Sequence, residues 1–224
     1  MSQDQEKKLA GEAAAALVQD GMIVGLGTGS TAAFAIQKLG ERVRGGMRIQ
    51  GVPTSEWTAA RARAEGIPLT DFSRVTHIDI TLDGADEFDP GLNLIKGGGG
   101  ALFREKIVAA ASQRLVIFAD STKRVPVLGR FPLPVEVNPY GWQVVAERIT
   151  ALGARVSLRQ KEGRPFVSDN HGHILDCAFG EIPNPEVLEE RLKHIVGVME
   201  TGLFVGMASL ILLAEGQTVH HLTR

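Results

Sequence analysis

The chain has 224 residues, 44% of them apolar, which is enough to bury the core of a globular enzyme in one larger domain or in one domain with a small partner. It carries 24 basic against 26 acidic residues, so there is no excess of positive charge for a nucleic-acid backbone, and nucleic acid is excluded as an expected partner. The longest apolar run, near 207–214, is far shorter than the roughly 18 to 20 residues of a membrane-spanning helix, so no membrane partner is expected.

Helices and strands are predicted to alternate through the first half of the chain. The polar, acidic N-terminus lacks the basic start and apolar middle of a secretory signal, which indicates a cytoplasmic protein, and it leads into a helix over 4–19. Further strands are predicted at 22–26, 48–52, 77–82 and 115–119, and helices at 31–39, 55–64 and 101–112. Ser55 is expected to cap its helix. Because the predicted strands alternate with helices, we expect right-handed crossover connections and a mostly parallel sheet.

The composition changes after Lys123, where four prolines fall between 126 and 139 and helical periodicity is weak. A domain boundary is therefore predicted near Arg130. The segment beyond it is expected to form a small α+β unit, with strands at 134–137, 154–158, 166–168 and 173–176 and helices at 143–152 and 185–194. The strand 208–214 and the tail 218–222 are expected to return to the first domain.

The segment Gly27-Thr28-Gly29-Ser30-Thr31 lies between a predicted strand and a predicted helix. Glycines let successive amides point into one concavity, hydroxyls add donors, and a helix start favours an anion, so the loop is suited to a phosphate. It lacks the third glycine of a dinucleotide fingerprint and the Gly-Lys-Ser/Thr ending of a P-loop. A plain turn is the alternative.

An acidic segment, Asp83-Gly84-Ala85-Asp86-Glu87, follows the strand predicted at 77–82. Open parallel sheets bind ligands at the carboxyl ends of their strands, so the three acidic side chains are expected to face a crevice. Asp83 and Asp86 can hydrogen-bond sugar hydroxyls or move protons between oxygens. A magnesium or calcium site is the rival chemical interpretation, and a solvated acidic turn is the other alternative.

Four consecutive glycines follow Lys96 and precede a predicted helix. Ordering them is costly, by about 0.5 to 1 kcal/mol each relative to alanine in regular structure, which favours close approach of the backbone to a ligand over a flexible hinge. Glu105 lies one turn into the helix and Lys96 lies on the other side of the loop. Together the segments suit proton transfer next to a carbonyl, in which Glu105 takes a proton from carbon while Lys96 and glycine amides stabilise the enediolate.

These three segments, with Ala119-Asp120-Ser121-Thr122-Lys123, resemble in order and spacing the type A ribose-5-phosphate isomerases. The resemblance covers essentially the whole chain. It implies a Rossmann-like α/β domain with a mostly parallel sheet, over 1–130 plus 200–224, and a smaller inserted α+β domain over 131–199. It also implies an aldose-ketose isomerase that interconverts D-ribose 5-phosphate and D-ribulose 5-phosphate through an enediolate, in the non-oxidative branch of the pentose phosphate pathway. The resemblance implies no cofactor and no metal, and it implies a homodimer or a homotetramer.

The resemblance also implies the roles of individual residues. The family's proton acceptor falls on Glu105; Asp83 is expected to assist opening of the furanose ring, Asp86 to relay a proton between O1 and O2, and Lys96 to stabilise the enediolate. The expected substrate-binding residues are Thr28, Gly29, Ser30, Thr31, Asp83, Gly84, Ala85, Asp86, Lys96, Gly97, Gly98, Gly99 and Lys123. Lys7 is similar to a lysine thought to approach the phosphate in the family, although a solvated helix end explains it equally well.

Other residues and rival functions are less well supported. The single Cys177 allows no internal disulfide and has no local base, so a structural role is expected, and the six histidines show no recognisable metal-ligand spacing. A sugar-phosphate-sensing domain of a bacterial regulator would need a DNA-reading helix pair, whereas the N-terminus predicts a single helix. A coenzyme A transferase-like enzyme would use a glutamate covalently.

Overall fold

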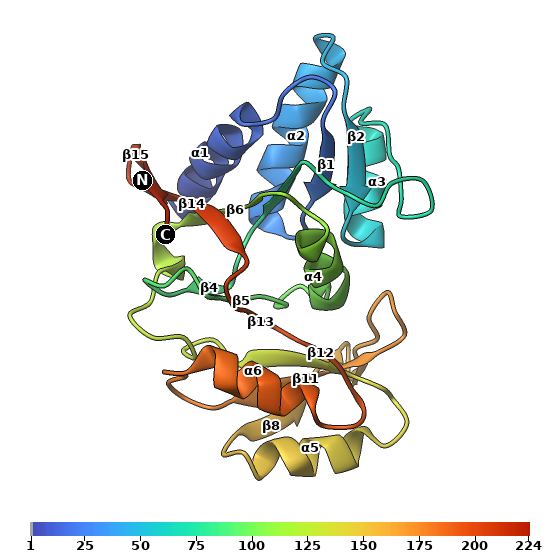
Figure 1. Cartoon of the computed structure of the whole chain (residues 1–224), viewed down its shortest axis with the longest axis vertical. Helices are drawn as coiled ribbons and strands as arrows, with labels where there is room; N and C mark the ends of the chain where they lie inside the picture. The colour runs from blue at the N-terminus through green and yellow to red at the C-terminus, as the bar shows by residue number, and fades with distance from the viewer. Residues whose placement is uncertain (1) are drawn as a thin grey trace. The chain divides into compact units, whose positions relative to one another are not determined.

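Figure 1 shows the computed structural model of the chain, which describes residues 2–224. The chain forms two compact units. The first unit comprises the residues up to Ala85 together with Arg104–Lys123 and Met207–Arg224, and the second comprises Asp86–Phe103 and Arg124–Gly206. The stretch 86–103 thus belongs by its contacts to the second unit, and the domain boundaries expected near 130 and 200 stay a prediction.

A six-stranded sheet forms the centre of the first unit, in the order β15-β14-β6-β3-β1-β2. Its strands are β1 (Ile23–Leu26), β2 (Gln50–Pro53), β3 (Ile80–Asp83), β6 (Leu115–Asp120), β14 (Ala208–Glu215) and β15 (Thr218–Leu222). All neighbours pair in parallel except β14 and β15, which are antiparallel. The predicted mostly parallel sheet and the return of the C-terminal strands to it are confirmed.

Helices of the first unit connect these strands. They are α1 (Gln3–Ala16), α2 (Ser30–Arg44), α3 (Glu56–Ala64), α4 (Leu102–Ala110), of which the part from Arg104 belongs to this unit, and the 3-10 helix η1 (Ser121–Lys123). The expected cap is confirmed, because Ser55 Oγ accepts the N–H of Thr58 at 3.0 Å at the start of α3.

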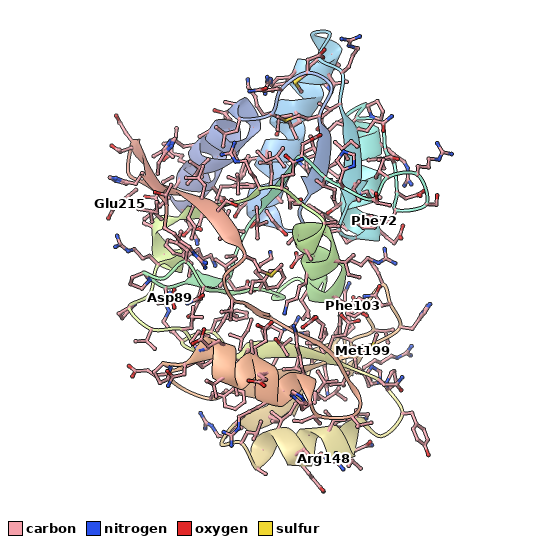
Figure 2. All side chains as sticks on the ribbon, in the orientation of Figure 1. Phe72, Asp89, Phe103, Arg148, Met199 and Glu215 are labelled. Carbon is pink, nitrogen blue, oxygen red and sulfur yellow. The ribbon has the colours of Figure 1, made fainter. Side chains whose placement is uncertain are left out.

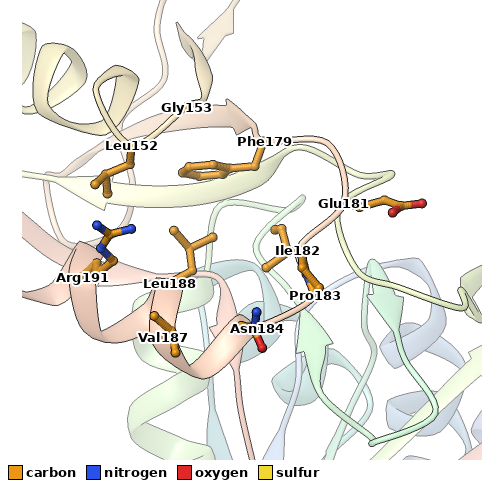
Figure 3. Close-up of a pocket in the computed structure, with 10 residues that line it drawn as sticks. All are labelled: Leu152, Gly153, Phe179, Glu181, Ile182, Pro183, Asn184, Val187, Leu188 and Arg191. Carbon is orange, nitrogen blue, oxygen red and sulfur yellow. The ribbon is translucent and has the colours of Figure 1, made fainter.

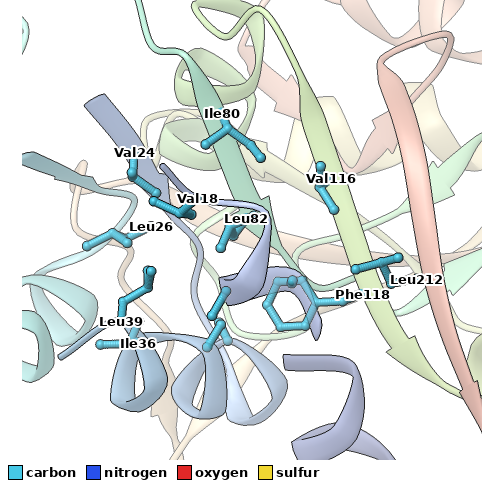
Figure 4. Close-up of a cluster of buried hydrophobic side chains, with 14 of the residues drawn as sticks. Val18, Val24, Leu26, Ile36, Leu39, Ile80, Leu82, Val116, Phe118 and Leu212 are labelled. Carbon is cyan, nitrogen blue, oxygen red and sulfur yellow. The ribbon is translucent and has the colours of Figure 1, made fainter. Parts of the chain in front are cut away.

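On one face of this sheet, the side chains of alternate residues of the central strands are buried in a hydrophobic cluster (Figure 4). The labelled members of this cluster come from β1, β3, β6, β14, α2 and the end of the N-terminal helical segment, and are Val18, Val24, Leu26, Ile36, Leu39, Ile80, Leu82, Val116, Phe118 and Leu212. The spacing of two residues along each strand places these side chains on the same face, where α1 and α2 cover them. The core therefore fixes the strand ends that carry the predicted motifs.

The second unit is an α+β structure, as predicted. Its main sheet is antiparallel in the order β12-β7-β11-β8. Its elements are β4 (Glu87–Phe88), β5 (Leu94–Ile95), β7 (Leu133–Val137), α5 (Trp142–Thr150), β8 (Arg155–Leu158), β9 (Gln160–Lys161), β10 (Arg164–Pro165), β11 (His173–Ala178), α6 (Pro185–Lys193), β12 (Val198–Thr201) and β13 (Leu203–Phe204). Cys177 is buried in the core of this unit, and burial raises the pKa of its thiol.

Some details of the second unit differ from the sequence-based expectation. The strand predicted at 166–168 is wrong, because Val167 makes only an isolated bridge to His173. The sequence does not predict the two-residue strands β4, β5, β9, β10 and β13, since two residues are too few to show an alternating pattern, and it also misses the four-residue strand β12. Exposed side chains such as Phe72 in the first unit and Arg148 on α5 point away from the ribbon (Figure 2).

Within residues 2–224, no helix has the length and apolar character that crossing a bilayer requires.

A buried carboxylate on α1 ties together two turns of the first unit. Glu6 Oε2 accepts the N–H of Ser121 at 3.0 Å and its hydroxyl at 2.8 Å, while Oε1 accepts the N–H of Gly216 at 2.9 Å. The hydrogen bond from the Ser121 main chain contributes most to lowering the pKa of Glu6 below its ordinary value. The ionised carboxylate therefore holds η1, and with it Lys123, against α1.

We predict that Glu6→Gln lowers the free energy of unfolding by about 1 kcal/mol near pH 7, because the amide accepts these hydrogen bonds less strongly. Since folding lowers the pKa of Glu6, this stabilisation is present above the unfolded-state pKa of about 4.3 and is lost as the pH falls below it. Urea unfolding of wild type and variant between about pH 7 and pH 3 measures the difference, which should shrink toward acid pH.

The matched control is Glu12→Gln on the same helix, where Glu12 lies 3.9 Å from Lys8 in a solvent-exposed pair. Its effect should stay within about 0.5 kcal/mol. A Glu6→Gln difference that does not vary with pH would contradict the role assigned to the ionised carboxylate.

Candidate active site

The loop at Gly27–Thr31 connects β1 to α2, and three buried hydroxyls hold its first threonine. Thr28 Oγ1 lies 2.8 Å from Thr54 Oγ1, 2.8 Å from Ser55 Oγ and 3.0 Å from Thr58 Oγ1. All three partners come from the segment that ends β2 and begins α3, and all are buried. We call Thr54, Ser55 and Thr58 the hydroxyl trio.

The hydroxyl trio also binds the main chain of the loop. Thr54 donates its hydroxyl proton to the carbonyl of Leu26, and Thr58 donates to the carbonyl of Gly27, each at 3.0 Å. Since Thr54 and Thr58 donate their protons to these carbonyls, the single proton of Thr28 Oγ1 can go to one member of the trio. The role of the Thr28 hydroxyl in phosphate binding stays a prediction, and the loop also offers main-chain amides.

Those amides lie at the start of a 15-residue helix. Gly29 is the N-cap of α2 with φ of +122°, a conformation that residues with a Cβ rarely adopt, and no side chain caps the helix. The first N–H groups of a helix and its macrodipole attract an anion. Gly29, Ser30 and Thr31 are thus placed where the sequence predicts a phosphate.

The structure brings the first aspartate of the acidic segment against this loop. Asp83 is the last residue of β3, is 1% exposed, and accepts the N–H of Gly84 through Oδ1 at 2.8 Å. A Cβ on Gly27 would lie 2.1 Å from Asp83 Oδ1, so only glycine allows the approach. Strands β1 and β3 are parallel neighbours, which explains why the segments that follow them meet.

Three more predicted residues belong to the first unit. Glu105 lies in the first turn of α4 and is 4% exposed. Lys123 ends η1 and is partly exposed. Lys7 is partly buried on α1, with its Nζ 3.6 Å from Asp4 Oδ1.

The second unit contains the remaining predicted residues. Gly98 donates its N–H to Asp86 Oδ2 at 2.7 Å, and a Cβ on Gly98 would lie 2.5 Å from Asp86 Oδ1. Gly97 and Gly100 have φ of +107° and +79°. Backbone conformation therefore favours glycine at 97 and 100, and at 98 a side chain would displace the Asp86 carboxylate from its present position.

Lys96 is held beside this loop. Its N–H donates to the carbonyl of Gly202 at 2.8 Å, and its Nζ lies 5.4 Å from the centre of the Phe204 ring. A cation over an aromatic face is attracted by the negative face of the ring. With 3% of its surface exposed, Lys96 is a buried cation of the kind that can stabilise a developing negative charge.

The position of Glu87 contradicts the expectation that all three acidic side chains of the segment face a crevice. Its side chain is 1% exposed, and its carboxylate accepts the N–H of Gly129 at 2.9 Å and that of Phe131 at 2.6 Å, beside the Arg130 guanidinium at 3.5 Å. The third acidic residue of the segment therefore does not face a ligand crevice. It anchors a loop of the second unit, and the sequence could not show this because the partners lie about 40 residues away.

A cavity of about 320 Å³ in the second unit contains none of the predicted site residues (Figure 3). It lies between Leu152 at the end of α5, Phe179 after β11, and Leu188 and Arg191 on α6. In the described part of the chain, no group of three or more His, Cys, Asp or Glu side chains is arranged to hold a metal ion.

Sequence reasoning missed two groups that hold the motif loops. The hydroxyl trio has a partial signal, because Thr54, Ser55 and Thr58 cluster around the predicted start of α3, where Ser55 was identified only as a cap. Arg159 donates to the carbonyls of Gly97 and Gly98, and no sequence pattern links it to residues about 60 positions earlier.

Comparison with known proteins gives a consistent result. Residues 50–218 match the family model described as ribose 5-phosphate isomerase A (phosphoriboisomerase A). The chain is 54% identical to the ribose-5-phosphate isomerase A of Gloeobacter violaceus over 225 residues, which covers 100% of this chain and 98% of that protein.

Solved structures are also similar over the whole chain. The structure of ribose 5-phosphate isomerase A from Methanocaldococcus jannaschii has a TM-score of 0.95 and 37% identity, with 100% of both chains covered. A structure of D-ribose-5-phosphate isomerase in complex with phospho-erythronic acid has a TM-score of 0.97 and 38% identity, again with 100% of both chains covered.

We predict that Thr58→Val weakens the binding of inorganic phosphate by about three- to tenfold, because a lost hydrogen bond of about 1 kcal/mol loosens the Gly27 peptide. Thr58→Ser should restore the affinity, and calorimetric titration measures both. The matched control is Thr81→Val, which removes another fully buried hydroxyl, one that lies 2.6 Å from Ser112 Oγ. If Thr81→Val weakens phosphate binding as much as Thr58→Val, the effect is general destabilisation and the role of the trio is wrong.

Proposed function

The chain belongs to the ribose-5-phosphate isomerase A family, and on this premise we propose that it interconverts D-ribose 5-phosphate and D-ribulose 5-phosphate with Glu105 as the base. The match of the family model over 50–218 carries the assignment. The protein is thus an isomerase, and a sugar phosphate is its small-molecule ligand. The rival functions, a sugar-phosphate-sensing domain and a coenzyme A transferase-like enzyme, have no comparable support.

Phosphate binding is assigned to the loop that begins α2. The amides of Thr28 to Thr31 would donate to the phosphate oxygens at the positive end of the helix, and Lys123 would add a cation. The hydroxyl trio supports this assignment, because it orients the loop without using those amides. Binding energy from the phosphate then holds the reacting carbons in place.

Ring opening is assigned to Asp83. Its carboxylate is oriented by the Gly84 N–H and by the close contact with Gly27. A carboxylate fixed in this way can take the proton of the C1 hydroxyl and pass it to the ring oxygen as the bond between C1 and that oxygen breaks, which gives the open aldehyde.

The isomerisation itself is assigned to Glu105, Asp86 and Lys96. Glu105 would take the proton from C2 of the aldose, which leaves negative charge on the enediolate, and would return it to C1. Asp86 would move the hydroxyl proton between O1 and O2, and the Lys96 cation would stabilise the enediolate. The remaining substrate contacts are proposed for Gly84, Ala85 and Gly97 to Gly99.

We further propose a cytoplasmic homodimer or homotetramer in the non-oxidative branch of the pentose phosphate pathway. The reaction interconverts two pentose phosphates, which supports the pathway. A single cysteine in 224 residues is typical of a protein of a reducing compartment.

We predict that Glu105→Gln lowers kcat by about 10² to 10⁴-fold, the usual contribution of a general base, because the amide cannot accept the carbon-bound proton. Affinity for phospho-erythronic acid should change by less than about threefold. A spectroscopic ketose assay and an inhibition titration measure the two quantities. Glu186→Gln, at the exposed first turn of α6, is the matched control and should be fully active. An active Glu105→Gln enzyme would refute the mechanism.

We also predict that the isomerase needs no metal ion. Dialysis against a strong chelator should leave kcat and KM unchanged in the same assay, because Lys96 and main-chain amides are expected to stabilise the enediolate. Strong inhibition that added magnesium reverses would instead assign Asp83 and Asp86 to metal ligation.

A further inference from the structure

We propose that Arg159 is a positioning residue, which orients two successive peptide groups of the glycine loop so that the N–H of Gly99 can donate to an enediolate oxygen. The inference rests on the proposed isomerase function. It adds to that function the N–H of Gly99 as a main-chain donor and Arg159 as the side chain that orients this N–H.

Four of the five N–H groups of the Arg159 guanidinium donate hydrogen bonds within the second unit. Its Nε donates to Asp176 Oδ2 at 3.0 Å and its Nη2 donates to Asp176 Oδ1, which forms a bidentate pair. Its Nη1 donates to the carbonyls of Gly97 at 2.7 Å and Gly98 at 3.1 Å. The planar fork of arginine can make these four contacts at once, which lysine cannot do.

Peptide geometry then determines where the amides point. In a trans peptide, the C=O and N–H point in opposite directions. The Gly97 carbonyl faces Arg159, so the N–H of Gly98 in the same peptide points away from Arg159, and there it meets Asp86 Oδ2 at 2.7 Å. This first peptide therefore links Arg159 on one side to Asp86 on the other.

The second peptide repeats the arrangement without an internal acceptor. The Gly98 carbonyl faces Arg159, so the N–H of Gly99 points away from it, toward the side of the loop where Asp86 lies. Gly99 is exposed, and its N–H has no hydrogen-bond acceptor among residues 2–224. Two successive N–H groups on one side of a glycine loop form a concavity suited to an anion.

This geometry matches the need of the reaction. Asp86 is assigned to the O1/O2 proton, so a donor on its side of the loop would meet the oxygen that becomes negative. Oriented donors of this kind contribute strongly because they need no reorganisation during the reaction. Without Arg159, the first peptide is still held by Asp86 and by the Gly100 N–H, which donates to the Gly97 carbonyl at 2.9 Å, whereas the peptide between Gly98 and Gly99 has the backbone freedom of glycine to rotate.

The test compares two ligands of the intact enzyme. Phospho-erythronic acid has a carboxylate, a planar two-oxygen anion like the enediolate, whereas inorganic phosphate tests only the phosphate loop. Arg159→Gln should raise the inhibition constant of phospho-erythronic acid about tenfold or more. It should also lower kcat by about tenfold or more. The inhibition constant of phosphate should change by less than about twofold. Arg159→Lys should fall between Arg159→Gln and wild type.

The matched control is Arg155→Gln, an exposed arginine on β8 of the same unit, which should behave as wild type. If Arg159→Gln does not fold, Asp176→Asn, which keeps the guanidinium but weakens its anchor, should shift the two ligands in the same unequal way. Unchanged affinity for phospho-erythronic acid, or an equal loss for both ligands, would overturn the proposal. An inactive wild-type enzyme would instead refute the isomerase function, so the two failures are distinguishable.

Discussion

In both aspartates proposed to move protons, the carboxylate lies where a side chain on a neighbouring glycine would be. Asp83 occupies the space where Gly27 would carry a Cβ, and Asp86 occupies the corresponding space at Gly98. Each carboxylate also accepts a main-chain N–H, from Gly84 and from Gly98 respectively. These contacts set the direction of the carboxylates, and proton transfer depends on direction as much as on acidity.

Groups outside the proposed set of substrate contacts hold the loops that belong to this set. The hydroxyl trio bonds the carbonyls of Leu26 and Gly27, Arg159 bonds those of Gly97 and Gly98, and Glu6 bonds the turn before Lys123. On the main chain of their loops, the hydroxyl trio and Arg159 bond only to carbonyl groups. Main-chain N–H groups of the same loops therefore stay available for an anion. A glycine loop has many conformations when unfolded, and these hydrogen bonds offset the entropy lost when it is ordered.

The chain crosses from one compact unit to the other within the sequence motifs. One passage lies between Ala85 and Asp86 in the acidic segment, and another lies between Phe103 and Arg104, just after the glycine loop. The proposed base Glu105 and the proposed phosphate loop belong to the first unit, whereas Asp86 and Lys96 belong to the second.

The sequence by itself determined the class of fold, the motif positions and the family, because these depend on local patterns. Alternating strands and helices predict a parallel sheet, and four short motifs in order carry the resemblance. Only the tertiary structure decided that the Thr28 hydroxyl is engaged by the trio, that Glu87 anchors a loop, and that Arg159 orients the glycines. The partners in these contacts are about 30, 40 and 60 residues apart, and periodicity within one helix or strand has no information about such pairs.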